Sequence, residues 1–303
     1  MSVARACTGP QSVLGEGARW DDRRAELLRV DILAGQVIRS RVADDGDLVE
    51  VRTYAVPGTV GAAAPVHGDD GWLLAAGRGV AHLAADGTLR PLVELAPPGT
   101  RMNDGACDPA GRFWTGTLAD DHREGGGALY RLDPDGRTSL VLDGLTISNG
   151  LGWSPDGTTM YLADSGPRTV TAFRFDVGRG TLADGRVLVT VPASTGAPDG
   201  LTVDAAGDVW VAIFGGGQVA RYAPDGTLRE TLLVPAAQAT SCAFGGPGLR
   251  RLYVTTATED WTDEQRRDDP AAGLVYRFAT DAVGIPARRF RPEPGWWASA
   301  APA

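Results

Sequence analysis

The 303-residue chain contains few cysteines and histidines and lacks a long apolar run. Its three cysteines, Cys7, Cys107 and Cys242, are odd in number, far apart and without a CxxC pair, which argues against a disulfide framework or a zinc knuckle. No apolar run approaches ~18 residues, so we expect no membrane span. The opening stretch MSVARACTGP lacks the apolar core of a secretory signal, and a cytoplasmic location is therefore expected.

Basic patches are also missing. The formal net charge is −9 and no stripe of arginines or lysines is apparent, which makes nucleic acid an improbable partner. We interpret the acidity as a source of solubility. No obligate protein partner is evident, so the expected partner is a small molecule. Hydrophobic residues make up 43% of the chain, enough for a substantial core.

Turn-forming residues are abundant instead, with 41 glycines and 20 prolines. A polar turn followed by a short apolar strand recurs every ~40–50 residues, which is the spacing of propeller blades. The recurring stretches are WDDRRAELLRVDI, HGDDGWLLAAG, DPAGRFWTGTL, SPDGTTMYLAD, DAAGDVWVAIF and GGPGLRRLYVTT. A third strand with period-2 alternation follows each of them, as in GALYRLDPDGRT and GQVARYAPDGTL.

Six such units predict an all-β fold, a six-bladed β-propeller with four-stranded blades around a central channel, forming one domain over residues 1–303. Because the ring must close, residues before Gly15 are expected to add a strand to the last blade. No window sustains a 3.6-residue period, so no major helix is expected. The stretch from Thr258, TEDWTDEQRRDDPAAG, is predicted to be a loop insertion that contains about one helical turn.

Four repeats carry a carboxylate or carboxamide in the same phase. Glu16, Asn103, Asn149 and Asp199 each lie five residues before the turn of their unit. Taken singly, Asn-Gly and Asp-Gly pairs are common turn formers, and Glu16 could be an exposed acid. The shared phase places all four at the start of an innermost strand, facing one axis. Buried like charges repel, and oxygen ligands without His or Cys favour Ca²⁺, Mg²⁺ or Mn²⁺.

The chain resembles the SMP-30/gluconolactonase/luciferin-regenerating-enzyme family. The resemblance implies a six-bladed propeller with one divalent cation in the channel, Ca²⁺ in first place, with Mg²⁺, Mn²⁺ and Zn²⁺ as alternatives. It covers most of the chain through the stretches LGEGARWD, RMNDGACDPAGRFWTGTL, ISNGLGWSPDG, APDGLTVDAAGDVWVA and TSCAFGGPGLRRLYVTTA.

The family's functional residues can be carried over one by one. The resemblance implies that Glu16, Asn149 and Asp199 are the metal ligands, and that Asp199 is also the catalytic base. It implies that Arg101 and Asn103 bind substrate, joined by an acid after Gly-Thr, for which Asp121 is our choice over Asp120. Two departures affect substrate identity more than the metal site. Leu28-Arg29 replaces an aromatic residue before Val-Asp-Ile, and Leu118 replaces a methionine.

This arrangement predicts a metal-dependent hydrolase that opens a sugar lactone or a similar cyclic ester. A cation polarises the lactone carbonyl, Asp199 accepts the proton of the attacking water, and Arg101 binds ring hydroxyls or an anionic substituent. A metal-dependent phosphotriesterase and a non-enzymatic calcium-binding or ligand-sensing propeller remain alternatives, because a fold does not fix function. A Ser-His-Asp triad is improbable, since none of the three histidines lies near a nucleophile elbow.

Overall fold

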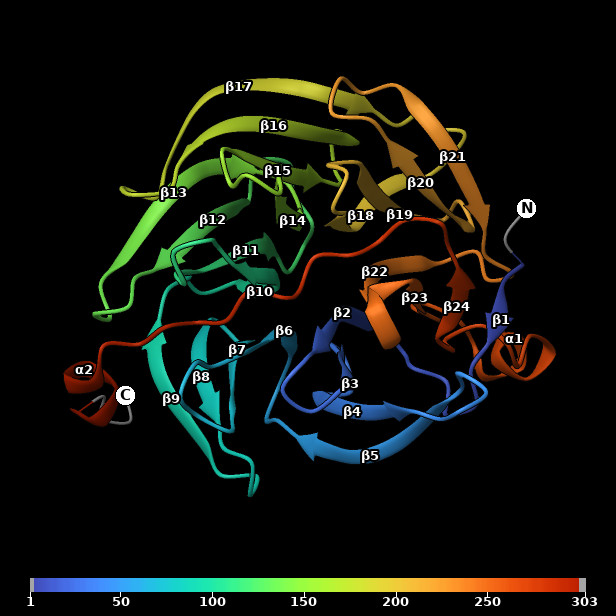
Figure 1. Cartoon of the computed structure of the whole chain (residues 1–303), viewed down its shortest axis with the longest axis horizontal. Helices are drawn as coiled ribbons and strands as arrows, with labels where there is room; N and C mark the ends of the chain where they lie inside the picture. The colour runs from blue at the N-terminus through green and yellow to red at the C-terminus, as the bar shows by residue number, and fades with distance from the viewer. Residues whose placement is uncertain (1–2, 300–303) are drawn as a thin grey trace.

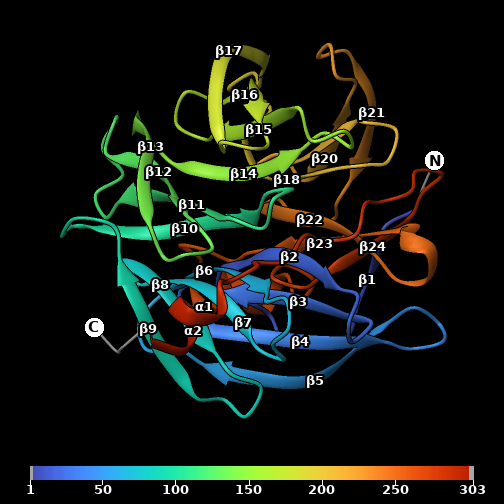
Figure 2. The ribbon, with the colours of Figure 1, turned by 60° about the vertical axis from the view of Figure 1, so that its left-hand side comes forward.

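The computed structural model describes residues 3–299, which form six four-stranded antiparallel sheets arranged as blades around a central axis (Figure 1). The predicted six-bladed β-propeller is confirmed. Each innermost strand packs against the innermost strand of the next blade, in the ring order β2, β6, β10, β14, β18, β22 and back to β2. Figure 2 shows the outer strands β5, β9, β17 and β21 at the periphery and β14, β18 and β22 near the middle.

Twenty-four strands make up the six blades. The first three blades comprise β2 (Gly15–Asp21), β3 (Glu26–Asp31), β4 (Gln36–Val42) and β5 (Leu48–Ala55); β6 (Val60–Pro65), β7 (Trp72–Ala76), β8 (Gly79–Leu83) and β9 (Leu89–Glu94); and β10 (Thr100–Cys107), β11 (Phe113–Ala119), β12 (Gly127–Leu132) and β13 (Thr138–Leu145). The next three comprise β14 (Ser148–Trp153), β15 (Thr159–Asp164), β16 (Thr169–Asp176) and β17 (Thr181–Thr190); β18 (Ala197–Val203), β19 (Val209–Phe214), β20 (Gln218–Tyr222) and β21 (Leu228–Leu233); and β22 (Ala239–Gly245), β23 (Arg251–Thr256), β24 (Tyr276–Ala279) and β1 (Arg5–Ala6).

The ring closes through the chain's first strand. β1 pairs antiparallel with β24, so the last blade takes its outermost strand from the N-terminal end of the chain. This confirms the prediction that residues before Gly15 complete that blade. The pairing joins Arg5 to Arg277, so closing the ring brings together segments far apart in the chain, at an entropic cost that grows only slowly with their separation.

The polar turns predicted from the repeat form between the first two strands of a blade, as the turn between β14 and β15 illustrates. In the hairpin between β14 and β15, the Gly157 amide donates to the Ser154 carbonyl at 2.9 Å, and Gly157 has a φ of 73°. The Asp156 carboxylate accepts hydrogen bonds from the Ser154 hydroxyl and the Thr158 amide. Glycine is required at this position because other residues rarely adopt a positive φ.

Tryptophans fill the space between blades. Trp114, Trp153 and Trp210 are at most 5% exposed and belong to the core. Trp114 and Trp153 meet edge to face, and both contact Phe175. The indole nitrogen of Trp210 donates to Asp204 at 2.9 Å. This hydrogen bond connects the turn between β18 and β19 to the core.

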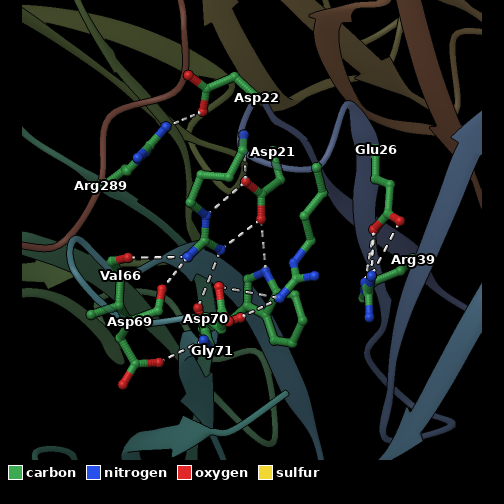
Figure 3. A network of polar contacts seen from close by, with 12 residues as sticks. Asp21, Asp22, Glu26, Arg39, Val66, Asp69, Asp70, Gly71 and Arg289 are labelled. Atoms are coloured by element: carbon green, nitrogen blue, oxygen red, sulfur yellow. Dashed lines mark hydrogen bonds and ion pairs between the residues drawn. The ribbon is translucent and has the colours of Figure 1, made fainter. Parts of the chain in front are cut away.

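The first two blades are joined by a polar network (Figure 3). The Arg23 guanidinium pairs with Asp21 at 2.7 Å and donates to the carbonyls of Val66, Asp69 and Gly71 across the blade junction. Asp21 also accepts from the Trp72 indole at 3.1 Å. The bond from Arg289 to Asp22, at 2.7 Å, attaches the C-terminal segment to the same network.

Residues 280–293 cross the face of the ring where the innermost strands end (Figure 1). The segment pairs with the fifth blade through the bridge between Asp204 and Gly284, and with the second blade through the bridge between Val66 and Phe290. It leads to α2 (Pro294–Ser299), while a short helix η1 (Pro247–Leu249) lies between β22 and β23. This mouth of the channel is therefore covered.

The insertion after β23 contains one short helix, α1 (Asp263–Asp268), as predicted. Thr262 caps it in a capping box with Gln265, which satisfies backbone amides that a helix start leaves unpaired. Within residues 3–299 no helix is long and apolar enough to cross a membrane.

Candidate functional site

All six innermost strands have a register shift at the same depth. In β10, β14 and β18 the shift spans Asn103, Asn149 and Asp199, and in β2 it begins at Glu16. Such irregularities interrupt the ladder and redirect a side chain. The common phase predicted from the repeats thus corresponds to a common break in strand pairing, which turns these side chains toward the channel.

The glycines that follow two of these residues allow close packing of neighbouring strands. A Cβ on Gly150 would lie 2.4 Å from the Asp199 carbonyl oxygen, and one on Gly200 would lie 2.5 Å from the Ser241 hydroxyl oxygen. Both pairs, Asn149-Gly150 and Asp199-Gly200, lie within strands rather than in turns. The turn interpretation of these pairs is therefore wrong, since the glycine serves strand packing around the axis.

The open mouth of the channel leads into a cavity of about 200 Å³. Its polar wall contains Glu16, Arg101, Asn103, Asn149, Asp199 and Glu259. Its apolar wall includes Ile32, Leu118, Ile147 and Phe214. Ser165 and His122 line the cavity as well. Glu16, Arg101, Asn103, Asn149 and Asp199 are residues that the sequence predicted, and they come from four different blades.

Two carboxylates are buried side by side in the cavity. Glu16 and Asp199 are 4% and 5% exposed. Burial first, and then repulsion from Asp104, raises the pKa of Glu16 to about 8. Burial and then the neighbouring Glu16 raise the pKa of Asp199 well above its ordinary value. The pair therefore carries a large unfavourable energy when both groups are ionised, unless a positive charge lies between them.

The Asn149 amide is oriented by its neighbours. Its Nδ2 donates to the Ser165 hydroxyl at 3.1 Å, and that hydroxyl donates to the Pro198 carbonyl at 2.8 Å. The amide oxygen is consequently aimed the other way, and it is buried with no hydrogen-bond partner among the described residues. Asp199 Oδ1 is likewise buried without a partner in residues 3–299. Unsatisfied buried oxygens are costly and rare, so each requires an explanation.

A hard divalent cation fits this donor set. Glu16, Asn149 and Asp199 supply oxygens only, which suits Ca²⁺, Mg²⁺ or Mn²⁺. Within the described part of the chain, no cluster of three or more His, Cys, Asp or Glu is arranged to hold a metal. A site here would therefore depend on the Asn149 amide as its third protein ligand.

Arg101 and Asn103 form a unit beside the carboxylates. Arg101 Nη1 donates to Asn103 Oδ1 at 2.9 Å and to the Met102 carbonyl at 3.2 Å. Asn103 Nδ2 in turn donates to the Ser148 carbonyl of the next blade at 3.0 Å. Asn103 thus uses both ends of its amide to hold Arg101 in place, and the rest of the guanidinium faces the cavity.

Asp121 is not in the cavity. Its side chain is 65% exposed and pairs with Arg123 at 2.9 Å. The adjacent His122 lines the cavity instead, with a positive φ of 55°. Of the two departures noted in the sequence, Leu118 lines the apolar wall. Leu28 and Arg29 are buried in β3, away from the cavity, where Arg29 contacts the Ser12 hydroxyl.

Three residues that the sequence did not single out also contribute. Glu259 and His122 line the rim, and Ser165 orients Asn149. They belong to loops between strands, outside the repeated phase, so no pattern in the sequence marked them.

A second cavity of about 100 Å³ lies deeper in the channel, between the innermost strands and residues 285–288 of the C-terminal segment. Asp104 and Arg19 line it, and Arg19 donates to the Gly105 carbonyl at 2.7 Å. Burial raises the pKa of Asp104, while Arg19 acts against that rise.

The chain is similar over most of its length to proteins with named activities. It is 36% identical over 277 residues to the pentonolactonase XacC of Haloferax volcanii, covering 90% of this chain and 93% of that protein. It is 37% identical to the L-arabinolactonase of Azospirillum brasilense, covering 94% of each. The crystal structure of a calcium-binding protein, regucalcin, from Agrobacterium tumefaciens superposes with a TM-score of 0.88 at 29% identity, covering 96% of this chain and 98% of that one.

Residues 14–258 match the family described as the SMP-30/Gluconolactonase/LRE-like region. That range contains Glu16, Arg101, Asn103, Asn149 and Asp199, and it includes all the innermost strands. The chain belongs to the SMP-30/gluconolactonase/LRE-like family.

Proposed function

We propose that this protein is a lactonase that hydrolyses a sugar lactone or a similar cyclic ester, using one divalent cation held by Glu16, Asn149 and Asp199. The observation that carries the proposal is the pair of orphaned, buried oxygens, Asn149 Oδ1 and Asp199 Oδ1, beside an arginine in a small cavity. Relatives named as a pentonolactonase and an L-arabinolactonase supply the reaction class.

The bound cation would polarise the carbonyl of the ester and stabilise the negative charge that develops on its oxygen. Asp199 holds a buried carboxylate beside the reacting position, and we assign it as the base that accepts a proton from the attacking water. In Glu16, next to it, Oε2 already accepts from the Gly17 amide at 2.9 Å, whereas Asp199 Oδ1 has no partner in residues 3–299.

Arg101 positions the substrate. Its fork of N–H donors is fixed by Asn103 and can bind hydroxyl oxygens on the ring. Ile32, Ile147 and Phe214 provide an apolar wall against which the C–H face of a sugar ring can pack while bulk water is excluded.

A calcium-binding protein without catalytic activity is the second candidate, favoured by the description of the Agrobacterium structure as calcium-binding. It requires the same cation ligands but gives no role to the Arg101–Asn103 unit. Lactone turnover therefore separates the two candidates.

The experiment is metal analysis of the purified protein, coupled to a pH-indicator assay over a library of aldonolactones, with a panel of organophosphate triesters alongside. We expect one divalent ion per chain, and lactone turnover that is lost with EDTA and restored by Ca²⁺, Mg²⁺ or Mn²⁺. Asp199→Asn should abolish turnover, whereas the matched control Asp121→Asn, at an exposed site outside the cavity, should not. Turnover of triesters alone, or cation binding without any turnover, would overturn the proposal.

A further inference from the structure

We infer that Glu259 is a specificity-determining residue that neutralises Arg101 and restricts the cavity to uncharged polyhydroxy lactones. The inference rests on the proposed function and deepens it. It selects between the two roles that the sequence left open for Arg101, binding of ring hydroxyls and binding of an anionic substituent.

Glu259 is held firmly at the rim by its backbone. Its amide donates to Gln238 Oε1 at 2.8 Å, and its carbonyl accepts from Gln238 Nε2 at 3.0 Å. The preceding Thr258 is 1% exposed, and its amide donates to the Val13 carbonyl at 3.0 Å. The following residue, Asp260, has a positive φ of 60°. These contacts fix where the Glu259 side chain begins, at the top of the cavity.

The Glu259 carboxylate itself has no protein partner. Among residues 3–299 it makes no hydrogen bond, and no ion pair within 4.0 Å, although it is half-buried and lines the cavity. All structural contacts of this residue use its backbone. The carboxylate is therefore not needed to hold the loop, and it is available to a ligand.

Arg101 lines the same cavity as this carboxylate. Of the described residues that line the cavity, Arg101 is the only arginine or lysine. Burial lowers the pKa of Arg101, and the largest opposing effect comes from Glu259, ahead of Glu16, Asp120 and Asp199. Burial likewise raises the pKa of Glu259, and Arg101 acts against that rise. The two oppositely charged side chains thus lie on the wall of the same cavity of about 200 Å³.

This charge balance determines which ligand fits between them. A hydroxyl group can accept from the Arg101 fork and donate to the Glu259 carboxylate at the same time. A phosphate, sulfonate or carboxylate in that position would gain Arg101 but would face Glu259 at close range, where like charges are unfavourable. The pair therefore favours a neutral sugar lactone over its anionic counterpart.

The test compares Glu259→Gln with wild type on glucono-1,5-lactone and 6-phosphoglucono-1,5-lactone. The matched control is Glu264→Gln, which makes the same change at an exposed position of α1 in the same insertion. We expect wild type and Glu264→Gln to prefer the neutral lactone in kcat/KM. Glu259→Gln should shift that ratio toward the phosphorylated lactone by about tenfold or more, the scale of one removed charge contact.

A binding measurement separates this inference from the proposed function. Calorimetric titration of the cation-loaded proteins with sorbitol and with sorbitol 6-phosphate needs no turnover. Glu259→Gln should bind the phosphate more tightly relative to sorbitol than wild type does. Failure of every protein to hydrolyse a lactone would overturn the proposed function alone. An unchanged neutral-to-anionic ratio in both assays would overturn the role of Glu259.

Discussion

Replacing Glu16 with glutamine should stabilise the metal-free protein while impairing cation binding. In the folded chain the pKa of Glu16 lies near 8, above its ordinary value of 4.5, because burial and Asp104 disfavour the ionised form. At pH 7 the unfolded chain carries this group ionised, and folding must protonate it. Glutamine has no proton to take up, so this cost of folding is absent in the variant.

The size of the effect follows from the linkage of protonation to folding. A proton taken up at pH 7 by a group with an unfolded pKa near 4.5 costs about 3 kcal/mol. Since the folded pKa is raised, the penalty is absent below pH 4.5, grows as the pH rises, and levels off above pH 8. A difference of ~3 kcal/mol corresponds to a Tm increase of roughly 5 °C for a chain of this size.

The assay is thermal unfolding in chelator-treated buffer from pH 5 to pH 9, on wild type, Glu16→Gln and the exposed control Glu264→Gln. The Tm advantage of Glu16→Gln should widen with pH, and the control should follow wild type. At 100 times the wild-type Kd, the cation should raise the free energy of unfolding of wild type by about 2.7 kcal/mol, and its Tm accordingly. The variant should gain much less at the same cation concentration. A variant that melts at or below wild type across the whole range in chelator would refute the reasoning.

Three further predictions concern single contacts. Asn149→Ala removes an amide oxygen of the cation site, so cation affinity measured by calorimetry should fall about tenfold or more, and an unchanged affinity would exclude it as a ligand. Arg101→Ala should raise KM or lower kcat/KM about 10²-fold with the cation content unchanged, as checked by metal analysis of the same sample, and loss of the metal would contradict its role. Trp210→Phe leaves buried Asp204 without its 2.9 Å indole donor, which should cost about 1–3 kcal/mol in urea unfolding, and a cost near zero would mean that the bond adds nothing.

The repeat in the sequence was sufficient to predict the fold and most of the polar wall. Turns in a fixed phase identify the blades, and the same phase identifies Glu16, Asn103, Asn149 and Asp199, because pseudo-rotational symmetry maps equal positions onto one axis. The structure adds the local cause, a register shift in every innermost strand.

What the sequence could not supply lies in the loops. Glu259 reaches the cavity from the insertion between β23 and β24, and His122 lines the cavity whereas Asp121 does not. Asn103 has a second task that the repeat did not predict, since its Oδ1 accepts from Arg101 and its Nδ2 donates to the Ser148 carbonyl of the next blade. Hydrogen bonds of this kind depend on residues of neighbouring blades, so they leave no periodic pattern in the sequence.

The central claim is that Glu16, Asn149 and Asp199 hold one cation on the axis of the ring. Anomalous diffraction from crystals grown with Mn²⁺ tests it directly. We predict a single anomalous peak in the cavity, about 2.0–2.6 Å from an oxygen of each of the three side chains. No peak there, or a peak bound by other residues, would contradict the account.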